Sequence, residues 1–225
     1  LYLYDLEGKL LGPVTSGEWA IRSAAGAVSW LRQAVHSIDE DGGWVYFTSI
    51  RKSSIEKQLY RVRLDGSGLE RLTKESGTHG IGFSENGRFY FNQHSSGSTP
   101  PSLSLHARDG SRLELVAPSR PGIFSRLGMR HPEHFSIKTR DGFRMPAELL
   151  KPAGFSPGRR YPVIMHVYGG PAAPMVKDAW PSRTYFDQVL LNHGYVVFRC
   201  DNRSATARSK ALENGILHDA WGSGE

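Results

Sequence analysis

Short runs of alternating apolar and polar residues fill the first half of the chain and predict β-strands. The run at 43–47 recurs at 87–91, and the run at 59–67 recurs at 103–111, both at a spacing of 44 residues. Each copy of the second run carries Asp-Gly near its end, and alternation that turns on Asp-Gly is typical of β-hairpins. Aromatic residues expected in the core of the first unit are Trp30, Trp44, Tyr46 and Phe47.

A further copy of the hairpin unit, at 3–8, opens the chain 58 residues before the copy at 59–67. The extra 14 residues fall between Ile21 and His36, which predicts an inserted loop or hairpin. A period of about 44 residues with several strands per unit is typical of propeller blades. We therefore predict that residues 1–118 are the last blades of a β-propeller truncated at its N-terminus, with roughly two and a half blades in view. A small β-sandwich built from the same hairpins is the alternative.

The pattern changes after a stretch with Pro and Gly at 119–132, which predicts an interdomain connection. Residues 133–225 combine apolar runs of strand length with a segment of helical spacing, as in an α/β sheet with parallel strands. The expected elements are strands at 135–138 and 145–150 around the turn Arg140-Asp141-Gly142, a strand from Tyr161 that stops at Gly169-Gly170-Pro171, a helix with Tyr185, Val189 and Leu190 that ends at Asn192-His193-Gly194, a strand at 195–200, and a helix beginning at Leu212. Position 133 is therefore the predicted start of a second domain.

Tyr168 is the first candidate for chemistry, because it ends an apolar strand and is followed by two glycines. Glycines let another backbone or a substrate approach closely, and ligands of α/β sheets bind at the carboxyl ends of strands. His166 lies two residues earlier, so on a strand it would share a face with Tyr168 and could tune it. The alternative is a plain core strand that ends in a turn.

The charge pattern argues against a nucleic-acid partner. The formal net charge is +6, but the basic residues are scattered among acids and form no stripe. Cys200 is the single cysteine, so the segment has no internal disulfide and no Cys-based zinc site, and its expected role is that of a small buried apolar residue. The nine histidines lack metal-ligand spacing, and we predict neither a metal nor a cofactor.

The localisation stays open. No stretch approaches the roughly 18 uncharged apolar residues of a membrane span, and no leader is in view. Because Leu1-Tyr2-Leu3-Tyr4 already reads as the inside of a strand, we expect the true N-terminus upstream. A periplasmic or secreted location is favoured over a cytoplasmic one.

Motifs along the whole chain resemble the dipeptidyl peptidase IV branch of the prolyl oligopeptidase (S9) family of serine peptidases. In the second half they are Tyr161-Pro-Val-Ile-Met-His-Val-Tyr-Gly-Gly-Pro171, Phe186-Asp187-Gln188, Gly194-Tyr-Val-Val-Phe198 and Asp201-Asn202-Arg203, and in the first half they are residues 1–6, 41–47 and 95–101. The resemblance implies a mixed fold, in which the C-terminal blades of a β-propeller are followed by the N-terminal part of an α/β-hydrolase domain at 133–225.

The resemblance also implies a function. Members of this branch release N-terminal dipeptides, favouring Pro or Ala at the second position, and Tyr168 matches the tyrosine that donates its hydroxyl to the oxyanion. Related branches tend to carry His-Gly-Gly where this chain carries Tyr-Gly-Gly. A peptide substrate and a homo-oligomeric parent protein are further implications.

The chain lacks the nucleophile motif of this family. No Gly-x-Ser-x-Gly is present, and the nearest match, Gly82-Phe83-Ser84-Glu85-Asn86, lies in a blade. We therefore expect all three triad residues beyond Glu225 and no activity of this segment alone. Relatives usually continue Asp-Asn-Arg with Gly-Ser-Gly, whereas this chain has Ser204-Ala205-Thr206-Ala207. That departure keeps a second reading open, a non-catalytic homologue that acts in binding.

Overall fold

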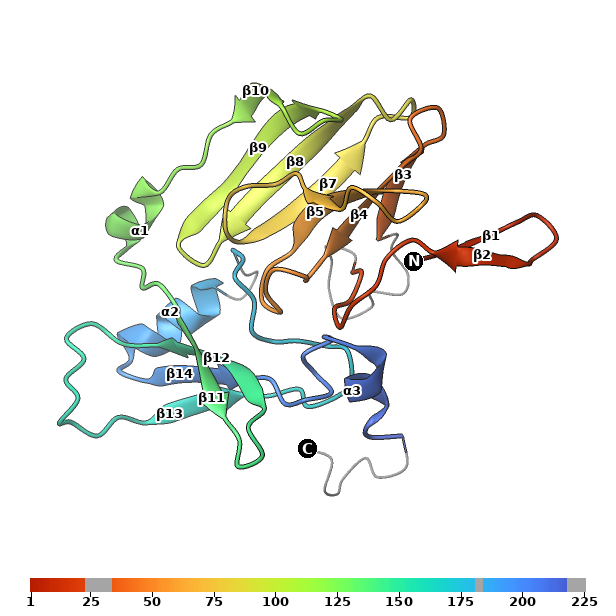
Figure 1. The fold of residues 1–225 in the computed structure, drawn as a ribbon. Helices are drawn as coiled ribbons and strands as arrows, with labels where there is room; N and C mark the ends of the chain where they lie inside the picture. The colour runs from red at the N-terminus through yellow and green to blue at the C-terminus, as the bar shows by residue number, and fades with distance from the viewer. Residues whose placement is uncertain (23–33, 181–183, 218–225) are drawn as a thin grey trace.

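The computed structural model describes residues 1–22, 34–180 and 184–217. Most of the insertion predicted between Ile21 and His36, including Trp30, and the Gly-Ser-Gly-Glu end of the chain lie outside the described residues. The strands of the first half lie above a smaller mixed sheet formed by the second half (Figure 1). Among the described residues, no helix has both the length and the apolar character needed to cross a membrane.

Two four-stranded antiparallel meanders form the body of the first half (Figure 1). The first contains β3 (Val35–Asp39), β4 (Trp44–Ser49), β5 (Gln58–Arg63) and β6 (Glu70–Arg71), and the second contains β7 (Thr78–Phe83), β8 (Phe89–Ser96), β9 (Thr99–Ala107) and β10 (Arg112–Ala117). Strands that are neighbours in the chain are neighbours in the sheet. The repeated strands and the Asp-Gly turns predicted from the sequence are thereby confirmed, and the described strands form open sheets.

The two meanders differ in register by one residue. Arg61 lies opposite Tyr46 in the first, so the spacing of 44 would place Leu105 opposite Tyr90 in the second. Instead His106 lies opposite Tyr90, because the pairing of β8 with β9 shifts near the end of β8. The His106 ring consequently stacks on Tyr90, with ring centroids 5.0 Å apart. Leu105 moves to the other face of the sheet, since successive side chains alternate.

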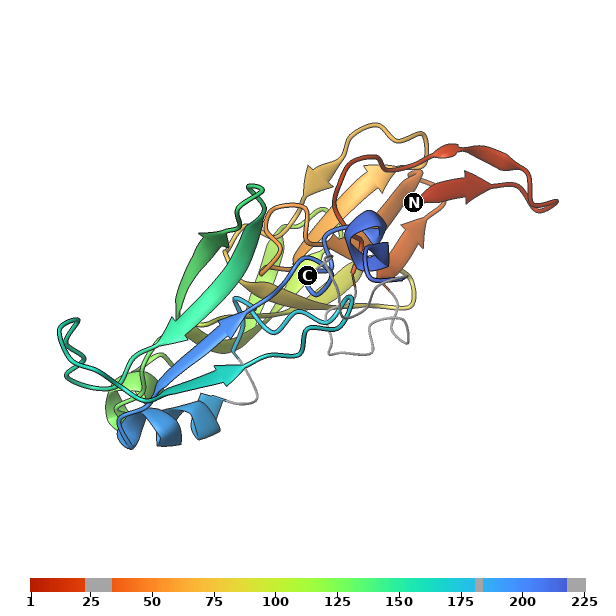
Figure 2. The ribbon, with the colours of Figure 1, turned by 90° about the horizontal axis from the view of Figure 1, so that it is seen from below.

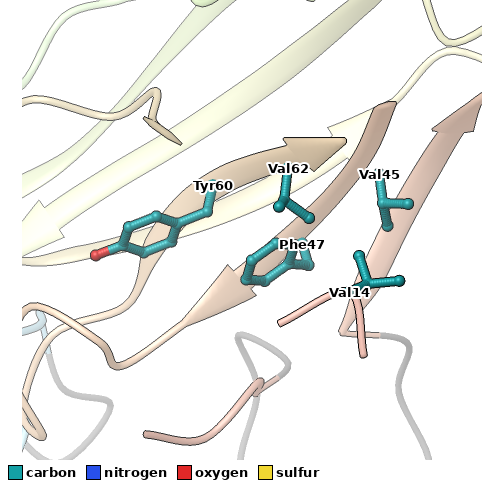
Figure 3. Packing of buried hydrophobic residues seen from close by; sticks show 5 residues of the cluster. All are labelled: Val14, Val45, Phe47, Tyr60 and Val62. Atoms are coloured by element: carbon teal, nitrogen blue, oxygen red, sulfur yellow. The ribbon is translucent and has the colours of Figure 1, made fainter. Parts of the chain in front are cut away.

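The core lies on both faces of the first meander. On one face, five buried residues pack together (Figure 3), namely Val14, Val45, Phe47, Tyr60 and Val62. On the other face, Tyr46 packs with Leu59, Leu72 and the Tyr90 of the second meander. Tyr46 and Phe47 are thus both core residues, as predicted, although they are neighbours in the chain and face opposite ways.

A separate hairpin, β1 (Tyr2–Tyr4) with β2 (Leu10–Pro13), precedes the meanders. It projects away from them in both views (Figures 1 and 2). Its strand β1 corresponds to the predicted first copy of the hairpin unit.

Helix α1 (Gly122–Leu127) lies within the connecting stretch and was not predicted. It has only six residues, of which Phe124 is the buried one, so it is too short for a repeating apolar pattern to predict it. The Phe124 ring packs against His131 and Trp180, with ring centroids 3.9 Å and 5.1 Å away. Gly128 ends the helix in the left-handed region.

The second half forms one mixed sheet with strand order β11-β12-β14-β13. Its elements are β11 (Glu133–Lys138), β12 (Arg144–Leu150), β13 (Val163–His166), α2 (Thr184–Asn192), β14 (Val196–Cys200) and α3 (Lys210–Asn214). The predicted hairpin is confirmed, and so is the parallel pair, β13 with β14. Helix α3 begins two residues before the predicted Leu212, because the Ser209 side chain caps it.

Arg199 is the centre of a buried ion network that joins the elements of this sheet. It lies on β14, is 5% exposed, and donates to both carboxylate oxygens of Asp187 on α2 at 2.7 Å. It also donates to Glu148 on β12. Glu148 in turn lies 3.2 Å from Nε2 of His134 on β11. Buried charges of this kind are tolerated only when they are paired and hydrogen-bonded.

The network predicts a pH dependence of stability through His134. Burial alone would lower the pKa of His134, but the hydrogen bond and negative charge of Glu148 outweigh it and raise the pKa above 6.5. Protonation of the His134 ring therefore stabilises the folded state. This stabilisation is fully present below pH 6.5 and is lost as the pH rises through the pKa of His134 in the folded protein. We expect the free energy of unfolding, measured in urea from pH 6 to pH 9, to fall as the pH rises above 6.5, and to fall by more in the wild type than in His134→Gln. Parallel curves for the two proteins would contradict this.

Candidate functional site

Tyr168 lies in the loop that follows β13, two residues beyond the end of the strand. Its side chain is 63% exposed. Gly169 has φ +74°, a backbone conformation that favours glycine. A Cβ on Gly170 would lie 2.6 Å from a ring carbon of Tyr168, so the ring lies over Gly170 and only a glycine leaves room for it. The two glycines thus have different roles, since Gly169 turns the chain and Gly170 leaves room for the phenol ring.

Asn202 connects this loop to the segment after β14. Its Nδ2 donates to the Gly169 carbonyl at 3.1 Å, and its Oδ1 accepts from the Ala205 amide at 3.0 Å. The loops meet again at the backbone, where the Ala172 amide donates to the Ser204 carbonyl at 2.9 Å. The Tyr168 loop is therefore held at Gly169 and again at Ala172.

The segment Ser204-Ala205-Thr206-Ala207 is buried and forms a turn. The Thr206 hydroxyl donates to the Arg203 carbonyl at 2.7 Å. Ala207 and Ala172 have φ +57° and are the non-glycine residues with positive φ in the described chain. An L-residue in this region costs about 1–2 kcal/mol, so the surroundings must hold both alanines in place.

The three residues after β14 each fasten a different segment. Both Asp201 oxygens accept backbone amides, from Met175 at 2.8 Å and from Val176 at 3.0 Å. Burial raises the pKa of the Asp201 carboxyl in spite of these two bonds.

Arg203 pairs with Asp141 in the turn between β11 and β12. Hydrogen bonds from Thr139 and Arg203 lower the pKa of Asp141 to about 2. Sequence reasoning used this triplet only as a family signature and missed these roles, although a polar triplet directly after a buried strand was the available signal.

The structure does not support a role for His166 beside Tyr168. Strand β13 ends at His166, so strand alternation does not extend to Tyr168. The Nε2 atom of His166 is buried and lies 3.9 Å from Oδ1 of Asp187, toward α2. Cys200 is a partly buried free thiol, and burial and Asp201 raise its pKa, which disfavours the nucleophilic thiolate.

The Ser84 hydroxyl is structural, and the cavity beside Arg22 is small. The Ser84 hydroxyl donates within a hairpin turn, to Asn86 at 2.9 Å and to the Phe89 carbonyl at 3.1 Å. No group of three or more His, Cys, Asp or Glu residues with metal-binding geometry occurs in the described ranges. A cavity of about 40 Å³ lies near Arg22 and Lys57, which is room for only a few water molecules. Tyr168 therefore remains the candidate group, an exposed neutral hydrogen-bond donor on a braced loop.

Comparisons with known proteins agree with this arrangement. Residues 1–101 match the family described as "Dipeptidyl peptidase IV (DPP IV) N-terminal region". Dipeptidyl peptidase 8 of Mus musculus is 29% identical over 214 residues, which are 91% of this chain and 23% of that protein. The probable dipeptidyl-aminopeptidase B of Emericella nidulans is 32% identical over 198 residues, 84% of this chain and 20% of that protein. The crystal structure of Porphyromonas gingivalis dipeptidyl peptidase 4 superposes with a TM-score of 0.81 at 28% identity, covering 96% of this chain and 29% of that one.

A propeller-like part of antiparallel sheets, followed by a mixed sheet that carries a Tyr-Gly-Gly loop, defines the class of propeller-bearing S9 proteins. Within that class, the family match of residues 1–101 and the relatives that align over most of the chain support a fragment of the dipeptidyl peptidase IV family. It spans about a fifth to a quarter of the length of the curated relatives.

The contact between Tyr168 and Gly170 predicts the effect of one methyl group. In Gly170→Ala the new Cβ takes the space under the ring, so the Tyr168 ring must swing away. We expect a crystal structure to show this displacement, while the thermal unfolding midpoint changes little. Gly158→Ala is the matched control, since a Cβ there meets nothing within 4 Å. An unmoved Tyr168 ring would contradict the prediction.

Proposed function

We propose that the parent protein is a serine exopeptidase that releases N-terminal dipeptides of the type Xaa-Pro or Xaa-Ala through an acyl-enzyme. Tyr168 donates its hydroxyl to the oxyanion of the tetrahedral intermediate. The observation that carries this proposal is the exposed phenol of Tyr168, seated over Gly170 at the carboxyl end of β13. The names of the relatives support the reaction class.

We propose the corresponding division of the chain. Residues 1–118 are the last propeller blades, residues 119–132 are the connection, and residues 133–225 begin an α/β-hydrolase domain. The parallel pairing of β13 with β14 and helix α2, which packs Leu191 against Leu150 and Val197, support the third assignment.

In the proposed mechanism, a serine beyond Glu225 attacks the peptide carbonyl while a histidine accepts its proton. Negative charge then develops on the carbonyl oxygen. A neutral hydroxyl aimed at that position lowers the barrier by about 3–4 kcal/mol when water is excluded. The second donor would be a backbone amide beside the nucleophile. The role of this segment is to hold the phenol in place, and alone it performs no hydrolysis.

A second candidate function is binding without catalysis. It is favoured by the segment 204–207, where Ser-Ala-Thr-Ala stands in place of the Gly-Ser-Gly expected from the family resemblance and where Ala207 carries a positive φ. The sequence after Glu225 separates the two functions, because an active peptidase needs Gly-x-Ser-x-Gly within roughly the next hundred residues.

The substrate class is tested by chromogenic dipeptides. We expect the full-length protein to release the chromophore from Gly-Pro and Ala-Pro substrates with kcat/KM at least about tenfold above a Gly-Leu substrate. Residues 1–225 alone should release none. Absence of release by the full-length protein would refute the peptidase proposal.

The oxyanion role is tested by Tyr168→Phe in the full-length protein. Removing one oxyanion donor lowers kcat by about 10²–10³-fold, and KM should change little because the ground-state substrate does not use the bond. Tyr185→Phe is the control, since it removes an equally exposed phenol from α2. Unchanged turnover in Tyr168→Phe would remove the role.

A further inference from the structure

The backbone of Arg22 is hydrogen-bonded to the end of β4 in the first meander. Its amide donates to the Thr48 carbonyl at 2.9 Å, and the Thr48 hydroxyl donates to the Arg22 carbonyl. The adjacent Ile21 bridges to Ser49 of the same strand, β4. The backbone of Arg22 therefore moves with the propeller-like part.

The side chain of Arg22 reaches into the second half of the chain. Its Nη1 donates to the Ala172 carbonyl and its Nη2 to the Ala207 carbonyl, both at 3.4 Å. Nη2 also pairs with Glu213 at the start of α3. The side chain is 14% exposed, so these contacts lie largely out of water. The two carbonyl bonds are long, but their donor is charged, which strengthens them.

The two carbonyls belong to the alanines with positive φ. Ala172 closes the loop of Tyr168, and its amide is already bonded to Ser204. Ala207 lies at the end of the 204–207 turn. Just before this turn, Asn202 donates to the Gly169 carbonyl. One guanidinium thus holds the far ends of both segments that carry the Tyr168 loop. A planar group with five donors can do this, whereas a lysine ammonium cannot span three acceptors in the same way.

We propose that Arg22 is a positioning residue for Tyr168: it locks the Tyr168 loop and the 204–207 turn against the propeller-like part, so that the phenol is preorganised for the oxyanion. This inference rests on the proposed function. A misplacement of about 1 Å at a reacting group costs up to about 10²-fold in rate, so a latch on the loop acts on kcat even though Arg22 does not touch the substrate.

The test compares Arg22→Met, Arg22→Lys and Lys210→Met in the full-length protein. Lys210 pairs with the same Glu213 at 2.6 Å but has no recorded bond to either alanine, which makes it the matched control. We expect kcat for an Ala-Pro substrate to fall about 10- to 100-fold in Arg22→Met, with KM within about twofold of the wild type. Arg22→Lys keeps a charge beside Glu213 and should restore the unfolding midpoint but not kcat. Lys210→Met should leave kcat unchanged.

Hydrogen exchange at the amides of Gly169, Gly170 and Ala172 gives a readout that does not need activity. Faster exchange in both Arg22 variants, and not in Lys210→Met, is expected. If the wild type releases no dipeptide, the proposed function fails, and the exchange rates alone decide whether the latch exists. Wild-type kcat and exchange in Arg22→Lys would overturn the inference, as would an equal loss in Lys210→Met. Arg22→Lys also keeps the test valid should Arg22→Met fail to fold.

Discussion

The buried charge of Arg199 is the constraint on which the second half of the chain depends. Glu148 of β12 and His166 of β13 lie directly opposite it in the two flanking strands, and Asp187 reaches it from α2. Leaving one partner of such a cluster uncompensated costs about 3–5 kcal/mol, far more than an exposed ion pair contributes. A shift of β14 by one residue would turn Arg199 to the other face of the sheet. The carboxylates of Glu148 and Asp187 would then lose their buried partner. The network therefore selects a single register.

That register positions the candidate site. Asp201, Asn202 and Arg203 follow the last residue of β14, so their directions are inherited from the strand. Asp201 fastens the loop around Met175, Asn202 fastens the Tyr168 loop, and Arg203 fastens the β11–β12 turn. The Tyr168 loop is thus positioned by polar contacts of the residues that directly follow the strand carrying Arg199.

Sequence patterns predicted the features whose cause is local. The repeated hairpins follow from alternation and Asp-Gly turns, and the Tyr168 loop follows from an apolar run that stops at two glycines. Helix α1 was missed because its six residues carry one buried side chain. The register shift that places His106 opposite Tyr90 could not be predicted. The latch at Arg22 could not be predicted either, since Arg22 and Ala172 are 150 residues apart and contacts at that distance leave no periodic signal.

The strand order also dictates when each part of the chain can take shape. Every strand of the two meanders pairs with a neighbour that has just been made, so these sheets can form while synthesis proceeds. The mixed sheet is different, because β14 follows both β12 and β13 in the chain and inserts between them. Until Arg199 emerges from the ribosome, Glu148 and Asp187 lack the guanidinium that joins them, and β12 and β13 have no common partner. The described part of the site-bearing sheet therefore cannot assemble before β14 is made.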